Sequence, residues 1–256
     1  MTKTTTCIYH FLVLNWYIFL NYYIPNIGKD EEKLKEFHDG GVHSKYLTIL
    51  NLLLQNIFFG VACLDDVLKR VKGSKDIKFI TSFRDLLFTT LAFPISTFVF
   101  LVFWALFFYD RNLVYPKGLD EFFPAWTNHA MHTAILPLLL VETILRPHHY
   151  PSKKLGLSLL SACNFAYIIR ILWRYAQTGN WVYPVFAFLS PLGIIIFFSA
   201  SAILSISIYL LGEKINQWTW DMKEDEEEPR VNRGGSNPLA ANQQTFHRET
   251  FPPTRT

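Results

Sequence analysis

Long apolar stretches alternate with short polar segments along most of the chain. A helix that crosses a membrane needs roughly 20 mainly apolar residues, and six stretches approach or exceed that length. The predicted spans are Cys7–Ile24, Tyr46–Leu64, Leu86–Tyr109, Thr127–Leu145, Leu155–Trp173 and Val182–Leu211. This pattern predicts an all-α fold, a multi-pass transmembrane helical bundle of about six spans.

Four prolines lie inside the predicted spans and should make those helices irregular. A proline removes one backbone hydrogen bond, and its ring displaces the carbonyl four residues earlier. We therefore expect kinks at Pro94 in the third span and at Pro137 in the fourth. The sixth stretch is long enough to tilt or break, and Pro184 and Pro191 are where a break would fall.

The end of the chain has a different composition. Residues 223–256 begin with an acidic run and continue rich in Asn, Gln, Pro and Thr, with few apolar side chains. Such a segment cannot bury enough apolar surface to offset the entropy lost on ordering. We therefore predict a six-span membrane domain over residues 1–222 and a disordered polar tail over residues 223–256.

Composition and charge exclude several functional classes. The chain is 50% hydrophobic and only 18% charged, whereas soluble domains average about 25% charged residues. Its net charge of +3 is not gathered into a basic stripe, so nucleic acid is not an expected partner. Cys7, Cys63 and Cys163 show no paired spacing, which argues against disulfides and zinc sites. Cys7 is a candidate for juxtamembrane acylation.

The distribution of Lys and Arg predicts the orientation. Six spans place both termini on one side, and the loops of that side carry eleven basic residues against six or seven opposite. Because basic loops stay in the cytosol, we expect a multi-pass integral membrane protein with cytosolic termini.

Polar residues within the spans need an explanation, because unpaired polar groups in a membrane cost a few kcal/mol. Thr48, Asn51 and Gln55 share one face of the second span, and Asn128 and His132 lie one turn apart in the fourth. Hydrogen bonding between helices is the ordinary explanation. However, Thr48 and His132 lie only about 3 Å and 7 Å below the same non-cytosolic surface, at 1.5 Å per residue. The two side chains can therefore meet.

A threonine hydroxyl attacks a carbonyl only if a nearby base accepts its proton, and a neutral imidazole is a suitable base. Thr48 and His132 are therefore candidates for a catalytic dyad that needs no metal or cofactor. Tyr46, Asn51 and Asn128 are candidates for stabilising an oxyanion or binding substrate.

Two other groups of residues have alternative explanations. Arg170 and Arg174 end the fifth span on the same side as Thr48; they would ordinarily reach the head groups, but could instead bind a substrate carboxylate. The pairs Asp65–Lys69, Asp66–Arg70 and Glu142–Arg146 have i, i+4 spacing, which we interpret as solvated anchors.

A metal site is the alternative chemistry for the histidines. His129 and His132 could join His38 and His43 of the preceding outer loop. His148 and His149 lie too far away, because 16 helical residues after His132 span about 24 Å.

Six sequence motifs resemble a known family. They are CIYHFLVL at 7–14, KYLT at 45–48 with CLDDVLKR at 63–70, FRDLLFTT at 83–90, NHAMHT at 128–133 and WVYPV at 181–185. The chain resembles the androgen-induced protein family over about Met1 to Trp220, whereas the tail departs from that family's compact ending.

The resemblance implies an intramembrane hydrolase of fatty acid esters of hydroxy fatty acids, with its threonine and histidine at Thr48 and His132. It also implies an indirect link to tissue factor pathway inhibitor and caveolar proteins, and residence in the plasma membrane including caveolae. A non-catalytic membrane regulator that acts through protein partners remains the alternative.

Overall fold

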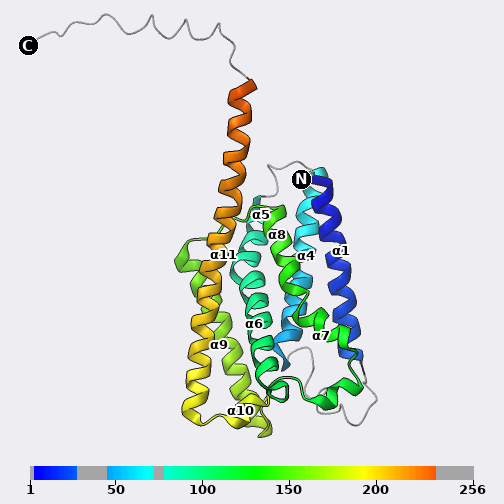
Figure 1. Ribbon diagram of the computed structural model, residues 1–256, viewed down its shortest axis with the longest axis vertical. Helices are drawn as coiled ribbons and strands as arrows, with labels where there is room; N and C mark the ends of the chain where they lie inside the picture. Colours follow the sequence, from blue (N-terminus) through cyan, green and yellow to red (C-terminus); the bar gives the residue numbers. More distant parts are fainter. Residues whose placement is uncertain (1–2, 28–44, 72–77, 235–256) are drawn as a thin grey trace, which may run out of the picture. The chain divides into compact units, whose positions relative to one another are not determined.

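The computed structural model describes residues 3–27, 45–71 and 78–234, with side chains as far as Met222. All regular elements in these ranges are helical, which confirms the predicted all-α class (Figure 1). The long helices are α1 (Lys3–Tyr23), α4 (Leu47–Val71), α5 (Lys78–Leu87), α6 (Phe93–Asp110), α7 (Ala125–His132), α8 (Ile135–Leu145), α9 (Lys153–Thr178) and α11 (Pro191–Gly234). Shorter elements are α10 (Val185–Phe188), a π-helix at Phe88–Ala92 and 3₁₀ turns at Ile24–Asn26, Arg111–Leu113 and Lys117–Glu121.

The chain divides into two compact units, Met1–Asn216 and Gln217–Thr256, and the helix packing, the cavities and the candidate site described below belong to the first. Helix α11 continues as far as Gly234. The predicted boundary at residue 222 therefore falls within α11; the disorder of the tail stays a prediction, and residues 235–256 lie outside the described range.

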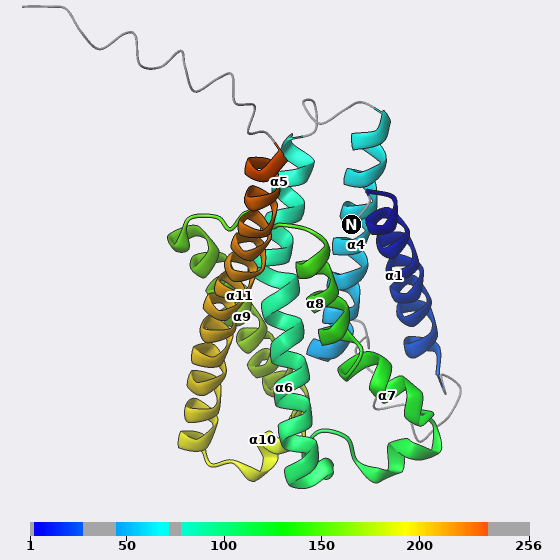
Figure 2. The ribbon, with the colours of Figure 1, turned by 45° about the horizontal axis from the view of Figure 1, so that its top comes forward.

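Four described helical segments are long and apolar enough to cross a membrane: Leu47–Val71, Lys78–Leu113, Lys153–Thr178 and Pro191–Met222. They match the second, third, fifth and sixth predicted spans. Large apolar side chains on their outer faces are exposed, such as Phe165 and Trp173, each 65% exposed on α9. Lipid solvates such side chains, so the chain is a multi-pass membrane protein. The first predicted span corresponds to α1, which lies along α4 (Figures 1 and 2).

The fourth predicted span is not one helix but two, α7 and α8, with a bend between them (Figure 2). Pro137 explains the position of the break, because its ring displaces the carbonyl of Thr133, four residues earlier. The amides of Thr133 and Ala134 both donate to the His129 carbonyl oxygen at 2.9 Å. The break makes His132 the last residue of α7.

The other prolines have similar effects. The π-helix over Phe88–Ala92 lies just before Pro94, and it includes Thr90, whose carbonyl the proline leaves without its usual partner. The sixth predicted span does not begin at Val182: α11 starts at Pro191, after the short helix α10. The predicted break of this span near Pro184 and Pro191 is therefore present.

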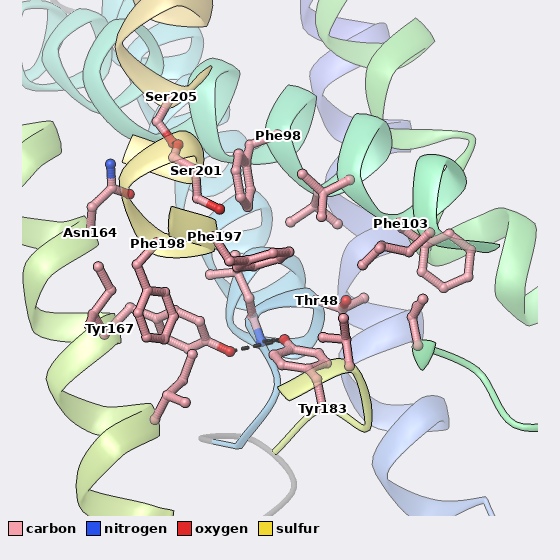
Figure 3. A pocket seen from close by; sticks show the side chains of 18 of the residues that line it. Thr48, Phe98, Phe103, Asn164, Tyr167, Tyr183, Phe197, Phe198, Ser201 and Ser205 are labelled. Carbon is pink, nitrogen blue, oxygen red and sulfur yellow. Dashed lines mark hydrogen bonds between the residues drawn. The ribbon is translucent and has the colours of Figure 1, made fainter. Parts of the chain in front are cut away.

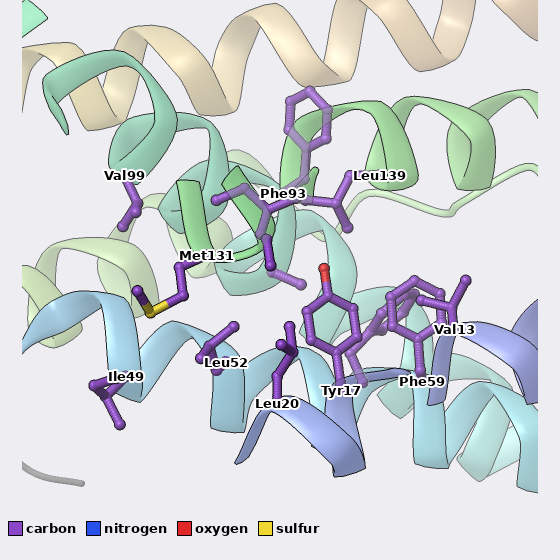
Figure 4. Packing of buried hydrophobic residues seen from close by; sticks show 14 of the residues in the cluster. Val13, Tyr17, Leu20, Ile49, Leu52, Phe59, Phe93, Val99, Met131 and Leu139 are labelled. Carbon is purple, nitrogen blue, oxygen red and sulfur yellow. The ribbon is translucent and has the colours of Figure 1, made fainter. Parts of the chain in front are cut away.

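Aromatic and aliphatic side chains fill the interface between α1, α4, α6 and α8. Tyr17 of α1 and Phe59 of α4 are fully buried and stack with their ring centroids 5.7 Å apart. Leu52 and Leu139 are likewise fully buried (Figure 4). This packing fixes α4 against its neighbours and so fixes the direction in which its first turn points.

A buried cluster of ionisable side chains joins the helices near the C-terminal end of α4. His10 of α1 lies 2.7 Å from Asp66 and 2.7 Å from Glu142, through its two ring nitrogens. Arg84 contacts Asp65 at 2.5 Å. Further members are Lys69, Asp85, Arg146 and His148.

The interpretation of Asp65, Asp66 and Glu142 as solvated anchors is therefore wrong. Asp65 does bond to Lys69 at 2.7 Å as its spacing predicted, but all three carboxylates are buried. Their partners come from helices far apart in the sequence.

We predict that Glu142→Leu destabilises the bundle by about 3 kcal/mol or more, because removing one partner of a buried ion pair leaves the other charge uncompensated. Thermal unfolding in detergent checks this. The matched control is Lys153→Gln: its contact with Glu213 is 3.7 Å long and its side chain is 68% exposed, so the change should cost less than about 1 kcal/mol. Equal melting temperatures for the two variants would contradict the prediction.

Candidate active site

The first turn of α4 and the last turn of α7 bring Thr48 and His132 together. The Thr48 Oγ1 lies 3.2 Å from His132 Nε2. Thr48 is half-buried and His132 is only 4% exposed. Their residue types and this distance suit proton transfer from the hydroxyl to the imidazole.

The second ring nitrogen of His132 determines which tautomer is present. Nδ1 lies 2.8 Å from the Asn128 side-chain oxygen and 3.1 Å from the Asn128 backbone oxygen. Both oxygens accept hydrogen bonds, so Nδ1 carries the proton and donates it. Nε2 is then the unprotonated nitrogen, and the Thr48 hydroxyl donates to it. The sequence predicted a dyad with Asn128 as a substrate contact; here Asn128 completes a Thr–His–Asn arrangement.

Phe103 of α6 holds the imidazole ring from one face. The two rings are stacked, with centroids 3.5 Å apart and planes at 7°. Sequence analysis did not identify Phe103, because the third span contains many aromatic residues and nothing in its pattern distinguishes this one.

The loop between α9 and α11 fixes the backbone ahead of Thr48. The Leu47 amide donates to the Tyr183 hydroxyl at 2.9 Å, and this hydroxyl lies 2.9 Å from that of Tyr167 (Figure 3). Burial raises the pKa of the Tyr183 phenol above its usual value of 10, so it remains a neutral hydroxyl. Thr48 is thus held as the second residue of α4, and the first amides of a helix generally lack a carbonyl partner within that helix.

Two cavities meet at Thr48. The smaller, of about 150 Å³, is lined mainly by apolar side chains of α6, α9 and α11 (Figure 3). The larger, of about 720 Å³, is lined by His132, the start of α4 and the two loops around Tyr115–Phe123 and Gly179–Ala187. Thr48, Phe103, Val114 and Tyr183 line both. A molecule with two arms can therefore reach Thr48 from both sides.

The other residues predicted to bind substrate do not line these two cavities. Asn51 lines neither cavity: its side-chain oxygen accepts from the Ser96 hydroxyl at 2.8 Å, which links α4 to α6. Gln55 donates to the same hydroxyl at 2.8 Å. Arg170 is exposed and Arg174 is half-buried on α9, and neither lines either of these two cavities.

Sequence analysis included Lys45 in a motif of the family resemblance but gave it no role in the site. It is 7% exposed and lines the larger cavity, and its ammonium lies 5.2 Å from the centroid of the Tyr46 ring. Its position in the KYLT motif, three residues before Thr48, was the available signal.

The described residues contain no group of three or more His, Cys, Asp or Glu side chains that could hold a metal ion. His129 is exposed, contacts Thr133 at 3.0 Å and stacks on Trp104. His38 and His43, which the metal hypothesis also requires, lie outside the described residues.

Comparison with known proteins assigns this chain to a family. The model of the FAR-17a/AIG1-like protein family matches residues 5–217. Androgen-dependent TFPI-regulating protein from Rattus norvegicus is 84% identical over 86% of this chain and 95% of its own length. The human protein of that name is 66% identical over 91% of this chain and all of its own length. Androgen-induced gene 1 protein from Homo sapiens is 40% identical over 73% of this chain and 83% of its own.

No solved structure matches the chain. The family match nevertheless covers every described helix up to α11 and both residues of the Thr48–His132 pair. The chain therefore belongs to the FAR-17a/AIG1-like family of membrane proteins.

Proposed function

We propose that this protein is a threonine-type intramembrane hydrolase that cleaves fatty acid esters of hydroxy fatty acids. The observation that carries the proposal is the 3.2 Å contact between Thr48 Oγ1 and His132 Nε2, at the point where two cavities meet. Its support is chemical: a hydroxyl, an unprotonated imidazole nitrogen and a hydrogen-bonded second nitrogen form a nucleophile, a base and an orienting group.

In the proposed reaction, Thr48 attacks the ester carbonyl carbon while its proton passes to His132 Nε2. The tetrahedral intermediate collapses, the bond to the alcohol oxygen breaks, and His132 returns the proton to that oxygen. The hydroxy fatty acid leaves and the acyl group stays on Thr48. His132 then takes a proton from water and the hydroxide equivalent attacks the acyl carbon. The bond from that carbon to Thr48 Oγ1 breaks, His132 returns the proton to Oγ1, and the fatty acid is released.

The developing oxyanion needs hydrogen-bond donors. The backbone amide of Thr48 lies in the first turn of α4, where amides are not used within the helix and the helix dipole is positive. We assign it this role, with Tyr46 as a candidate second donor. Such preorganised donors stabilise the transition state more than the ground state.

The smaller cavity suits the acyl chain. Its lining contains no Lys, Arg, Asp or Glu among the described residues, and it lies between helices whose outer faces meet lipid. A lipid ester can therefore enter sideways from the bilayer rather than from water.

The decisive test compares Thr48→Ala and His132→Ala in membranes with matched expression. We expect both to lose ester hydrolysis by at least about a hundredfold, the range of general-base effects, and Thr48→Ala to lose labelling by a fluorophosphonate probe. Thr48→Ser should keep measurable activity because it keeps a hydroxyl. His129→Ala is the control, because His129 lines neither cavity. Full activity of Thr48→Ala would refute the proposal.

Asn128→Ala should lower kcat about tenfold with little change in KM, because His132 Nδ1 keeps only the backbone acceptor; a hydrogen bond is worth about 1 kcal/mol. Asn128→Asp retains a side-chain oxygen and should restore most of kcat. Steady-state kinetics distinguish a positioning role from a substrate contact, for which KM would rise instead.

Ala202 of α11 lines the smaller cavity. Ala202→Phe should fill part of it and lower hydrolysis of esters with long acyl chains about tenfold, while short-chain esters are affected less. Rates on an acyl-length series check this; a uniform loss would place the acyl chain elsewhere.

A second candidate function comes from the relatives' names. Four of them are called androgen-dependent TFPI-regulating protein, so we propose that this chain also influences tissue factor pathway inhibitor indirectly. That role would place it in the plasma membrane, including caveolae, with cytosolic termini. If Thr48→Ala left this regulation intact, the protein would act as a non-catalytic regulator through partners such as caveolar proteins.

A further inference from the structure

Tyr183 lies where the two cavities meet, and its hydroxyl contacts the start of α4. Among the described residues that line both cavities, Phe103 and Val114 are apolar, whereas Thr48 and Tyr183 carry a polar side-chain atom. In the proposed reaction the ester carbonyl lies at this junction, with one arm of the substrate in each cavity. The Tyr183 hydroxyl therefore borders the reacting carbonyl together with Thr48.

The hydrogen bonds of the Tyr183 hydroxyl leave its own proton available. Its oxygen accepts from the Leu47 amide at 2.9 Å and lies 2.9 Å from the Tyr167 hydroxyl (Figure 3). Tyr167 has one hydroxyl proton, and its other acceptor, the Lys45 carbonyl oxygen, is farther away at 3.4 Å. Tyr167 therefore donates to Tyr183. The Tyr183 oxygen then accepts two hydrogen bonds, while its O–H donates to no residue in the described part of the chain.

This arrangement makes the Tyr183 hydroxyl a good donor. Hydrogen bonds that a hydroxyl accepts polarise its O–H, which strengthens the bond that it donates. Burial raises the pKa of the Tyr183 phenol, so the proton stays on the oxygen at neutral pH. The Tyr46 ring packs edge-on against the Tyr183 ring, with centroids 5.9 Å apart, and so restricts its orientation.

The covalent geometry of α4 places this proton near the Thr48 amide, which we have assigned to the oxyanion. The Tyr183 oxygen lies 2.9 Å from the Leu47 nitrogen. The nitrogen of the next residue, Thr48, is about 3 Å farther along a helical backbone. The two donors are therefore no more than about 6 Å apart. An oxyanion about 3 Å from each of two donors fits between them.

We propose that the Tyr183 hydroxyl donates a hydrogen bond to the oxyanion that forms when Thr48 attacks the ester carbonyl. The inference rests on the proposed hydrolase function and adds a catalytic residue to it. The proton stays on Tyr183 throughout, so no covalent bond to this side chain forms or breaks. The hydrogen bond strengthens as the carbonyl oxygen gains negative charge, and it therefore stabilises the transition state more than the bound ester.

The test compares the wild type with Tyr183→Phe on a fatty acid ester of a hydroxy fatty acid, at matched expression. We expect kcat to fall about a hundredfold, as when one oxyanion donor is removed, and KM to change less than about twofold. Affinity for a trifluoromethyl ketone analogue, which forms a charged tetrahedral adduct with Thr48, should fall by a similar factor. Affinity for an ether analogue, which cannot form an oxyanion, should stay unchanged.

Two further variants separate the donated proton from the structural contacts. Tyr167→Phe removes one hydrogen bond to the Tyr183 oxygen but leaves the Tyr183 proton, so kcat should fall no more than about fivefold, the worth of one hydrogen bond. Tyr175→Phe is the matched control and should behave like the wild type. Tyr175 is exposed, stacks on Trp181 with centroids 3.9 Å apart and lines neither cavity.

The outcomes distinguish this inference from the proposed function. Full kcat in Tyr183→Phe, equal losses in Tyr183→Phe and Tyr167→Phe, or equal weakening of both analogues overturns the role of Tyr183 while the hydrolase function stands. A wild type that does not hydrolyse the ester overturns both.

A second measurement decides the inference if Tyr183→Phe does not fold. Replacing Tyr183 with 3,5-difluorotyrosine keeps the hydroxyl but makes it more acidic. Because an ionised phenol cannot donate, activity should be lost at a lower pH on the alkaline side than in the wild type. An unshifted pH profile would overturn the role of Tyr183.

Discussion

Polar groups inside an apolar bundle must find their partners within the protein, and this constraint governs the rest of the structure. Lipid offers no hydrogen bonds, so an unpaired side chain there is costly. The buried ionic cluster around His10 and Glu142 meets the requirement at one end of α4. Thr48 and His132 meet it at the other. The same physical requirement that binds the helices together thus also brings a hydroxyl and an imidazole into contact.

Prolines give the bundle the irregular geometry that the site needs. The break caused by Pro137 ends α7 at His132, so the imidazole lies at a helix end instead of within a continuous span. The break before Pro191 leaves a loop in which Tyr183 holds the Leu47 amide. Both deviations orient the residues beside Thr48, so backbone interruptions far apart in the sequence act on one site.

The two cavities differ in character because different elements line them. Three apolar helices surround the smaller, and loops with polar residues surround the larger. Thr48 lies between an environment suited to a hydrocarbon chain and one lined in part by polar side chains. An amphiphilic ester has the same division, with its carbonyl between two arms. This correspondence connects the fold of the bundle to the chemistry that we propose for it.

The sequence by itself determined the helical class and four of the segments that are long and apolar enough to cross a membrane, because these follow from apolar length. Only the tertiary structure decided the rest. Glu142 has the spacing to reach Arg146 but bonds to His10 of α1, and Asn128 bonds to His132 and lines neither of the two cavities at Thr48. Pattern and spacing constrain neighbours within one helix, whereas partners on other helices depend on how the helices pack against one another.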